Sequence, residues 1–166
     1  MASRVDPMTD QPFTPLDPAG RARMVDVTAK QPTVRAATAS GMVRCGPEVV
    51  ALLRSGEVPK GDVLAVARIA GIQGAKKTPD LLPLAHVIGV HGASVDLEVT
   101  DEGVAIVATV RTADRTGVEM EALTAVAVAG LAVIDMVKWI DRSAHLAEVK
   151  LHAKEGGRSG VWKRDV

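Results

Sequence analysis

Aromatic residues are nearly absent from this chain of 166 residues, since Phe13, Trp139 and Trp162 are the only three and there is no tyrosine. Surfaces that stack on nucleic-acid bases need several aromatic side chains, so the composition argues against a base-stacking protein. The core must instead be built from aliphatic residues and methionine. With 47% hydrophobic residues, the chain is typical of one globular domain rather than of a disordered protein.

The chain also lacks a net charge and a second cysteine. Its 20 basic residues balance 20 acidic residues, whereas a general nucleic-acid binder usually carries a basic excess. The lone Cys45 excludes a disulfide within the chain and a cysteine-based zinc site, and it fits a reducing compartment. We therefore expect a cytoplasmic protein that binds no nucleic acid.

No hydrophobic run is long enough to suggest a membrane span. The longest, residues 122–137, is shorter than the roughly 20 residues required and contains Asp135. Residues 1–18 have no apolar stretch that could serve as a signal peptide. Prolines and the lack of periodicity predict a flexible tail over residues 1–21, ahead of a single domain at 22–163, and the glycines near the C-terminus predict a mobile segment at 154–166.

Two helices can be placed from their ends and their apolar spacing. Asp62 is suited to cap the first, which is periodic from residue 63 and closes at the lysines 76–77. The second extends from about residue 116 to 138, because Thr116 and Glu119 match a capping box. It is apolar on almost every side, so we expect it to be buried.

Alternating apolar and polar residues predict the strands. Residues 95–99 and 104–111 flank a glycine turn and predict a hairpin, and residues 147–151 predict a last strand. Shorter signals predict strands at 24–27 and 36–45 and a short helix at 47–53. Strands with interspersed helices and a hairpin indicate an α+β layered sandwich.

Asp135 and Lys138 lie three residues apart and so share one face of the second helix. Because Asp135 interrupts a long apolar run, we expect its carboxylate to be buried and to need a partner. A structural ion pair with Lys138 and a proton-transfer couple with shifted pKa values explain this spacing equally well.

Glu119 and Glu121 begin the same helix, where capping and the helix dipole would account for both. Glu121 and Asp135 are fourteen residues apart, or about 21 Å along a helix. If both act in catalysis, they cannot lie side by side in one subunit. Each would instead meet residues of a neighbouring subunit.

The remaining candidates are weaker when taken singly. His86 follows Leu84 and Ala85 in a proline-containing apolar segment, and a lone histidine is more often structural than catalytic. Arg35, Lys60 and Lys154 are scattered basic residues close to small ones, and together they suit a polyanionic small substrate. The four histidines show no metal-ligand spacing, so we expect no metal site.

Several segments, in order along the chain, resemble one known family. They are residues 23–28, 33–35, 60–62, 67–72, 76–84, 116–125, 135–138 and 154–160, of which the block TGVEMEALTA at 116–125 is highly specific. Over residues 22–163 the chain is similar to the molybdenum cofactor biosynthesis protein C (MoaC) family, the cyclic pyranopterin monophosphate synthases.

The resemblance implies a ferredoxin-like two-layer subunit, with an antiparallel sheet and helices packed on one face. It implies a homohexamer assembled as a trimer of dimers, with active sites at dimer interfaces and no cofactor. The implied substrate is 3′,8-cyclo-7,8-dihydroguanosine triphosphate. A lyase reaction would convert it to cyclic pyranopterin monophosphate and release pyrophosphate, as a step of molybdenum cofactor biosynthesis.

The resemblance also implies roles for individual residues. Asp135, Lys138 and Lys60 match the family's catalytic groups. The residues matching substrate-binding segments are Leu84, Ala85, His86, Met120, Glu121 and the adjacent Glu119, with Arg35 and Lys154 around the triphosphate.

Ala85 departs from the family pattern, because a cysteine is usual at this position before the histidine. The change leaves open an alternative, a catalytically reduced paralogue that binds a purine nucleotide triphosphate or partner enzymes as a structural subunit. A generic purine-nucleotide-binding module is a third reading. Turnover with pyrophosphate release separates the enzyme from both.

Overall fold

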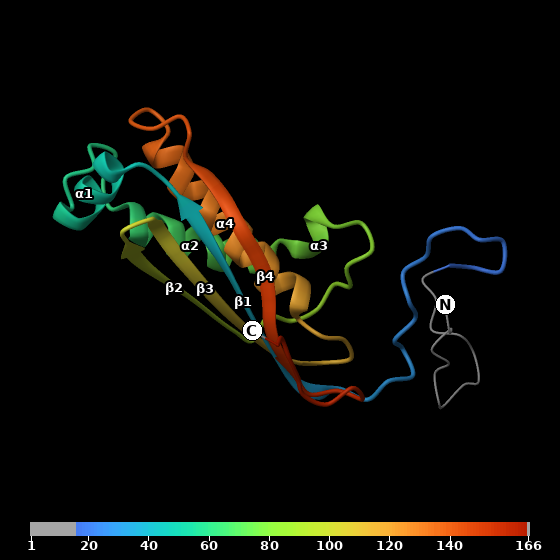
Figure 1. Cartoon of the computed structure of the whole chain (residues 1–166). Helices are drawn as coiled ribbons and strands as arrows, with labels where there is room; N and C mark the ends of the chain where they lie inside the picture. Colours follow the sequence, from blue (N-terminus) through green and yellow to red (C-terminus); the bar gives the residue numbers. More distant parts are fainter. Residues whose placement is uncertain (1–15, 166) are drawn as a thin grey trace.

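The computed structural model of the chain describes residues 16–165, so most of the tail predicted at residues 1–21 lies outside the described residues. A five-stranded antiparallel sheet forms one layer and the long helices α2 and α4 form the other (Figure 1). The strands are β1 (Thr33–Arg44), β2 (Gly92–Thr100), β3 (Gly103–Asp114), β4 (His145–Glu155) and β5 (Trp162–Lys163); the helices are α1 (Pro47–Ser55), α2 (Val63–Lys76), α3 (Thr78–Leu81) and α4 (Glu119–Val137).

The strand order is β2-β3-β1-β4-β5. Strand β1 pairs antiparallel with β3 along its whole length and with β4 on its other side, and β2 pairs with β3 as the predicted hairpin. Strand β3 lies between β1 and β2, which are joined by the helical connection α1–α3. Strand β1 lies between β3 and β4, which are joined by α4. This is the ferredoxin-like arrangement, and the two-layer α+β prediction is confirmed.

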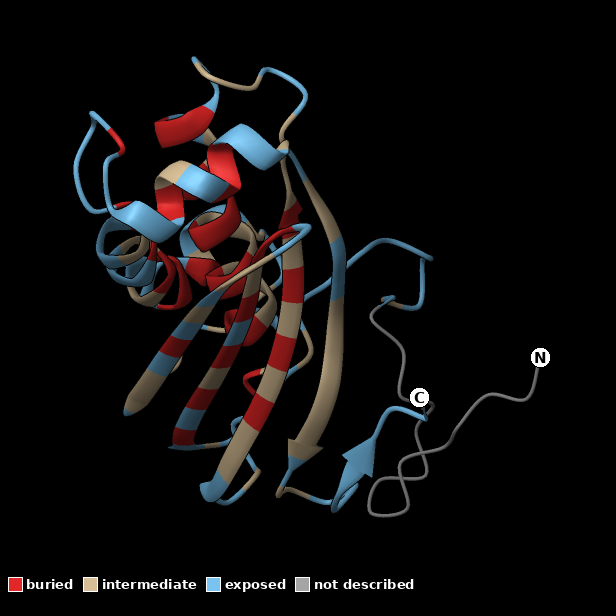
Figure 2. Cartoon of the chain, turned by 60° about the vertical axis from the view of Figure 1, so that its left-hand side comes forward, coloured by how far each residue is buried: buried red, intermediate tan, exposed pale blue. Residues whose placement is uncertain are grey.

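The helices cover one face of the sheet. Along β1, buried Ala37, Ala39 and Val43 alternate with half-buried Thr38 and Ser40 because successive side chains point to opposite faces. Figure 2 shows the same alternation of buried and less buried residues along the neighbouring strands. The apolar core therefore lies between the sheet and the helices, and the opposite face of the sheet is open.

Helix α4 is the central helix of the core, packed against α2 and against strands β1, β3 and β4. Its approach to α2 is close, because a Cβ atom at Gly71 would lie 2.9 Å from the carbonyl oxygen of Ala125 and one at Gly74 only 2.8 Å from Val128 Cβ. By length and composition α4 could cross a membrane, but half of its most apolar stretch is buried here, as in a core helix.

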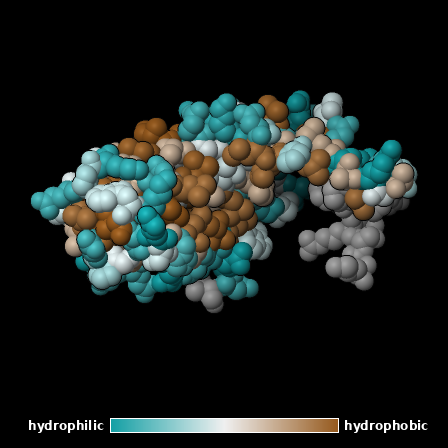
Figure 3. Space-filling model, turned by 90° about the horizontal axis from the view of Figure 1, so that it is seen from above, coloured by the Kyte–Doolittle hydropathy of each residue, from teal (hydrophilic) through white to brown (hydrophobic). Residues whose placement is uncertain are grey.

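Helix α4 is buried as expected on the side that faces the core, but its outward side is not covered. Its inward face is buried, but Leu131 is 59% exposed on the outward face, as is Ile69 at 67% on the neighbouring α2. Figure 3 shows that hydrophobic atoms also gather on the surface across the middle of the molecule, between more hydrophilic ends. Helix α4 is therefore apolar on both sides. One side packs on the core, and the other leaves apolar side chains exposed.

Local signals succeeded at α2 and failed at the start of α4. Asp62 caps α2, and its carboxylate accepts a hydrogen bond from the amide of Ala65 at 2.9 Å. Helix α4 instead begins at Glu119, after Val118, with no side-chain cap. The capping box predicted from Thr116 is therefore absent, since Glu119 is the first residue of the helix rather than the third. The Glu119 carboxylate lies 3.4 Å from Lys154 Nζ instead.

Two other segments differ from the sequence-based expectation. Residues 24–27 form no strand. The sheet consists of the five strands named above, and this segment is not one of them. At the other end of the chain, Ala153 pairs with Lys163 and Lys154 with Trp162, which adds the unpredicted strand β5. The mobility expected of the glycine-rich segment stays a prediction.

Candidate active site

The C-terminal end of α4 carries a cluster of three charged groups, Lys60, Asp135 and Lys138, which we call the lysine–aspartate cluster. Lys138 Nζ lies 2.6 Å from Asp135 Oδ1. Lys60, in the loop between α1 and α2, donates a hydrogen bond to the carbonyl oxygen of Asp135 at 2.9 Å and lies 3.8 Å from its Oδ2. The structure thus brings together the three residues that the sequence marked as catalytic candidates.

The Asp135 carboxylate is exposed, with 62% of its side chain accessible. The expectation of a buried carboxylate is therefore wrong, because the helical period places Asp135 on the outward face of α4 while its apolar neighbours Met136 and Val137 point into the core. The hydrogen bond and charge of Lys138, followed by the charge of Lys60, lower the pKa of Asp135. The carboxylate is therefore ionised at neutral pH, and its negative charge holds the two ammonium groups in place.

The N-terminal end of α4 carries a second group of charges. Lys154 on β4 lies 3.4 Å from the carboxylate of Glu119 and donates a hydrogen bond to Ser159 Oγ at 2.6 Å. Arg35 on β1 donates to the carbonyl oxygens of Asp114 and Arg115 at 3.1 and 3.2 Å. Both cations are therefore held in place by the protein.

Glu121 lies in the first turn of α4 and is buried, with 3% of its surface exposed. Burial raises the pKa of its carboxyl group, and the nearby negative charge of Glu119 adds to the increase while His86 opposes it. His86 donates from Nε2 to the carbonyl oxygen of Val25 at 2.6 Å. Glu121 and His86, 35 positions apart in the sequence, are thus neighbours in one electrostatic group with Glu119.

The apolar candidates differ in how accessible they are. Leu84 and Met120 are exposed, which is unusual for such side chains and leaves them free to contact a ligand, whereas Ala85 is half-buried. The Ala85 amide donates a hydrogen bond to the carbonyl oxygen of Leu82. The candidate residues at the start of α4 are together called the N-terminal group. They are Arg35, Leu84, Ala85, His86, Glu119, Met120, Glu121 and Lys154.

The two sets of candidate residues do not meet within the subunit. Glu121 and Asp135 lie in the first and last turns of one continuous helix, so α4 separates the N-terminal group from the lysine–aspartate cluster by about 20 Å. Neither end of α4 therefore holds all of the candidate residues.

Comparisons with known proteins agree with the resemblance in the sequence. A sequence model of the MoaC family matches residues 24–157. The chain belongs to the MoaC family. A curated relative from Streptomyces avermitilis, named cyclic pyranopterin monophosphate synthase, is 58% identical over 158 residues, which cover 95% of this chain and 93% of that protein.

Other relatives of this MoaC-family chain carry the same name. The protein from Streptomyces coelicolor is 60% identical over 152 residues, covering 92% of this chain and 89% of the relative. The protein from Geobacter metallireducens is 51% identical over 155 residues, covering 92% of this chain and 97% of the relative. The similarity therefore extends over nearly the whole length of each protein.

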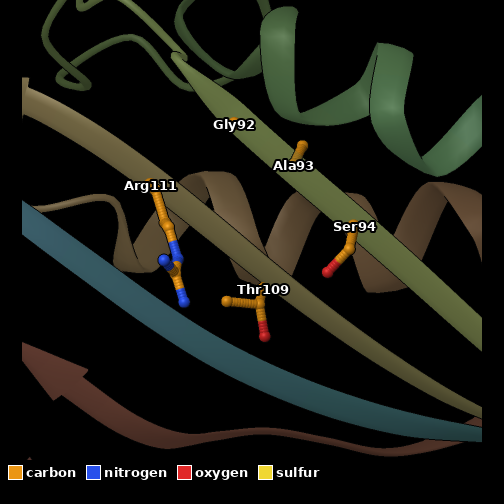
Figure 4. Close-up of a pocket in the computed structure, with 5 residues that line it drawn as sticks. All are labelled: Gly92, Ala93, Ser94, Thr109 and Arg111. Atoms are coloured by element: carbon orange, nitrogen blue, oxygen red, sulfur yellow. The ribbon is translucent and has the colours of Figure 1, made fainter.

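Two shallow hollows lie on the open face of the sheet, away from both sets of candidates. The larger, of about 400 Å³, is lined by Gly92, Ala93, Ser94, Thr109 and Arg111 (Figure 4). The other, of about 240 Å³, includes Ser40 and His152, whose Oγ and Nε2 atoms are 2.6 Å apart. Neither hollow is lined by a residue of the two sets.

Two features of this region were missed from the sequence of the MoaC-family chain. Ser159, read only as part of a flexible segment, is a hydrogen-bond partner of Lys154, and the carbonyl of Val25 is the partner of His86. For Ser159, the pattern in the sequence that could have indicated this contact was a serine among closely spaced glycines. Among residues 16–165, no group of three or more His, Cys, Asp or Glu side chains could hold a metal ion.

Proposed function

We propose that this chain is a cyclic pyranopterin monophosphate synthase, which converts 3′,8-cyclo-7,8-dihydroguanosine triphosphate to cyclic pyranopterin monophosphate and pyrophosphate. The observation that carries the proposal is the lysine–aspartate cluster, where Lys60 and Lys138 converge on Asp135 from two separate segments. The name shared by relatives at 51–60% identity over 89–97% of their lengths supports it.

The chemistry needs several proton transfers, because the guanine-derived ring must be opened and rebuilt as a pterin. Lys60 and Lys138 are the proton-transfer groups of the cluster, and the ionised Asp135 carboxylate holds and orients their ammonium groups. The carboxyl group of Glu121, whose pKa is raised by burial, stays protonated to a higher pH than an exposed glutamate. With His86 it offers hydrogen bonds to the ring.

The second part of the reaction is a phosphoryl transfer. A substrate hydroxyl attacks the α-phosphorus, the bond from this phosphorus to the bridging oxygen breaks, and pyrophosphate leaves with the electron pair. Arg35 and Lys154 are the cations of the N-terminal group, so they bind the triphosphate and stabilise the departing charge.

The complete site requires a second subunit in this proposal. A two-fold axis near the middle of α4, with two copies of the helix antiparallel, would place the start of one α4 beside the end of the other. The exposed Leu131 lies on the outward face of α4, the same face as Asp135, and offers an apolar contact for such a pair. Each dimer would then hold two sites, and a trimer of dimers would form the hexamer.

The same proposal includes the cellular setting. The chain works in the cytoplasm on a small molecule, without nucleic acid or membrane, because its lone cysteine and balanced charge fit that compartment and a diffusible substrate. Ala85, in place of the family's usual cysteine, does not remove any of the charged groups described above.

The deciding experiment supplies enzymatically made cyclic dihydroguanosine triphosphate and measures pyrophosphate and the pterin product, with Asp135→Asn as the control. Product from the wild-type protein and none from the variant is the expected result. Tight binding of the substrate without product would contradict the proposal and point to a non-catalytic paralogue. Activity gained by Ala85→Cys would then identify the cause.

A further inference from the structure

The turn between β4 and β5, residues 156–160, lies directly against Arg35 and Lys154. We call it the glycine turn. Its three glycines, Gly156, Gly157 and Gly160, have φ angles of 86°, 70° and 62°, in the left-handed region that side chains disfavour. Because β5 pairs back onto β4, the turn is closed beside Lys154 rather than leading away from it.

Ser159 holds the ammonium group of Lys154 from one side. Lys154 Nζ donates to Ser159 Oγ at 2.6 Å, and the carboxylate of Glu119 lies 3.4 Å from the same nitrogen. An ammonium group has three donors. With two directed at Ser159 and Glu119, the third is left for an anion, and its direction is set by the other two.

Gly157 makes room for the guanidinium group of Arg35. A Cβ atom on Gly157 would lie only 2.4 Å from Arg35 Nη1 and 2.8 Å from Arg35 Cζ. The guanidinium group therefore occupies the space that a side chain at residue 157 would need. Two of its donors already point at the carbonyl oxygens of Asp114 and Arg115. Any other residue at 157 would push the guanidinium out of this seat.

We propose that the glycine turn orients the two triphosphate-binding cations, with Ser159 directing Lys154 and Gly157 seating Arg35. The inference rests on the proposed function, because that function assigns both cations to the triphosphate. Ser159 and Gly157 are positioning residues, since they act through Lys154 and Arg35. Cations fixed before the substrate arrives need no ordering when it binds, which improves triphosphate affinity.

Ser159 is tested by paired substitutions. Ser159→Ala removes the acceptor, and we expect KM to rise about 3- to 10-fold while kcat changes less than about twofold. Ser159→Thr keeps a hydroxyl group and should restore KM. Calorimetric titration with inorganic triphosphate should show the same loss and rescue without any turnover. Unchanged triphosphate affinity in Ser159→Ala would overturn the role of Ser159.

Gly157 is tested against a control with the same backbone strain. Gly56, which ends α1 with a φ of 72°, has no atom within 4 Å of its Cβ position, so Gly56→Ala adds strain without a contact. We expect Gly157→Ala to weaken triphosphate binding about tenfold and Gly56→Ala to leave it unchanged, with similar melting temperatures. Equal affinities in the two variants would contradict the seating of Arg35.

The outcomes separate this inference from the proposed function. Wild-type protein that binds inorganic triphosphate but makes no product would refute the synthase activity, and the triphosphate titrations would still decide the role of the turn. Wild-type turnover with unaltered KM and triphosphate affinity in both variants would refute only the positioning role. Failure of the wild-type protein to bind triphosphate would refute the positioning role as well.

Discussion

Lys138 Nζ lies 2.6 Å from a carboxylate oxygen of Asp135, one helical turn before it on α4, and Lys60 reaches the same residue from the loop that precedes α2. All three side chains are substantially exposed. Exposed ion pairs contribute little to stability, so we expect variants of these three residues to change turnover more than folding. Measuring turnover and stability in the same variants separates a role in catalysis from a role in folding.

Replacement of Asp135 by asparagine removes the charge and keeps the shape. We expect turnover to fall at least about 100-fold, because the negative charge that holds Lys60 and Lys138 in place is lost. The melting temperature should change by less than about 2 °C. Asp101→Asn is the matched control, since Asp101 forms an exposed ion pair with Arg54 at 2.7 Å that involves none of the candidate residues. Comparable loss of turnover in both variants would rule out a specific role for Asp135.

Replacement of Lys138 by alanine should raise the pKa of Asp135 toward its ordinary value. Lys138 is the main cause of the lowered pKa, and Lys60 adds to it. A lowered pKa makes a stabilising contribution that is present at neutral pH and is lost as the pH falls through the folded-state pKa, so the variant should lose less stability on acidification. NMR titration of the Asp135 carboxyl carbon measures the shift, with Lys77→Ala as the control. A titration curve that is identical in Lys138→Ala and wild type would refute the coupling.

Replacement of Glu121 by glutamine should separate stability from activity. Burial raises the pKa of Glu121, so the folded state favours the protonated carboxyl and loses stability relative to the variant as the pH rises through that pKa. The variant should therefore gain in free energy of unfolding over wild type as the pH rises from below the ordinary glutamate pKa to neutral, while turnover falls. Denaturant melts across this range test the sign. A relative stability that falls with pH would show that an ionised Glu121 is well compensated in the folded protein.

Mixing two inactive variants tests whether one site is built from two subunits. Subunits with Glu121→Gln and subunits with Asp135→Asn, refolded together in equal amounts, should form mixed dimers in which one of two sites has both wild-type residues. Random pairing then predicts about one quarter of wild-type turnover. If both residues acted within one subunit, no mixture would regain activity. Each variant refolded alone supplies the background rate.

Much of the local structure follows from residues close together in the sequence. Asp62 caps α2 by accepting a hydrogen bond from the amide three residues later. The alternating patterns of β2 and β3 stand on either side of a short turn, and the two strands pair as a hairpin. The apolar run of α4 likewise predicts a core helix. The resemblance carried by the block at residues 116–125 led to the family, and the candidate residues came with it.

Only the tertiary structure decided how those residues are grouped. Lys60 and Asp135 are 75 positions apart, and nothing in either segment says that they meet. The Thr116 capping box is absent because α4 begins only at Glu119, whose carboxylate pairs with Lys154 on another strand. Asp135 is exposed because the sheet and α2 cover only one side of α4. Helix periods and caps depend on a few neighbouring residues, so the sequence determines them directly. The outcome of competition between distant segments depends on the packing of the whole chain.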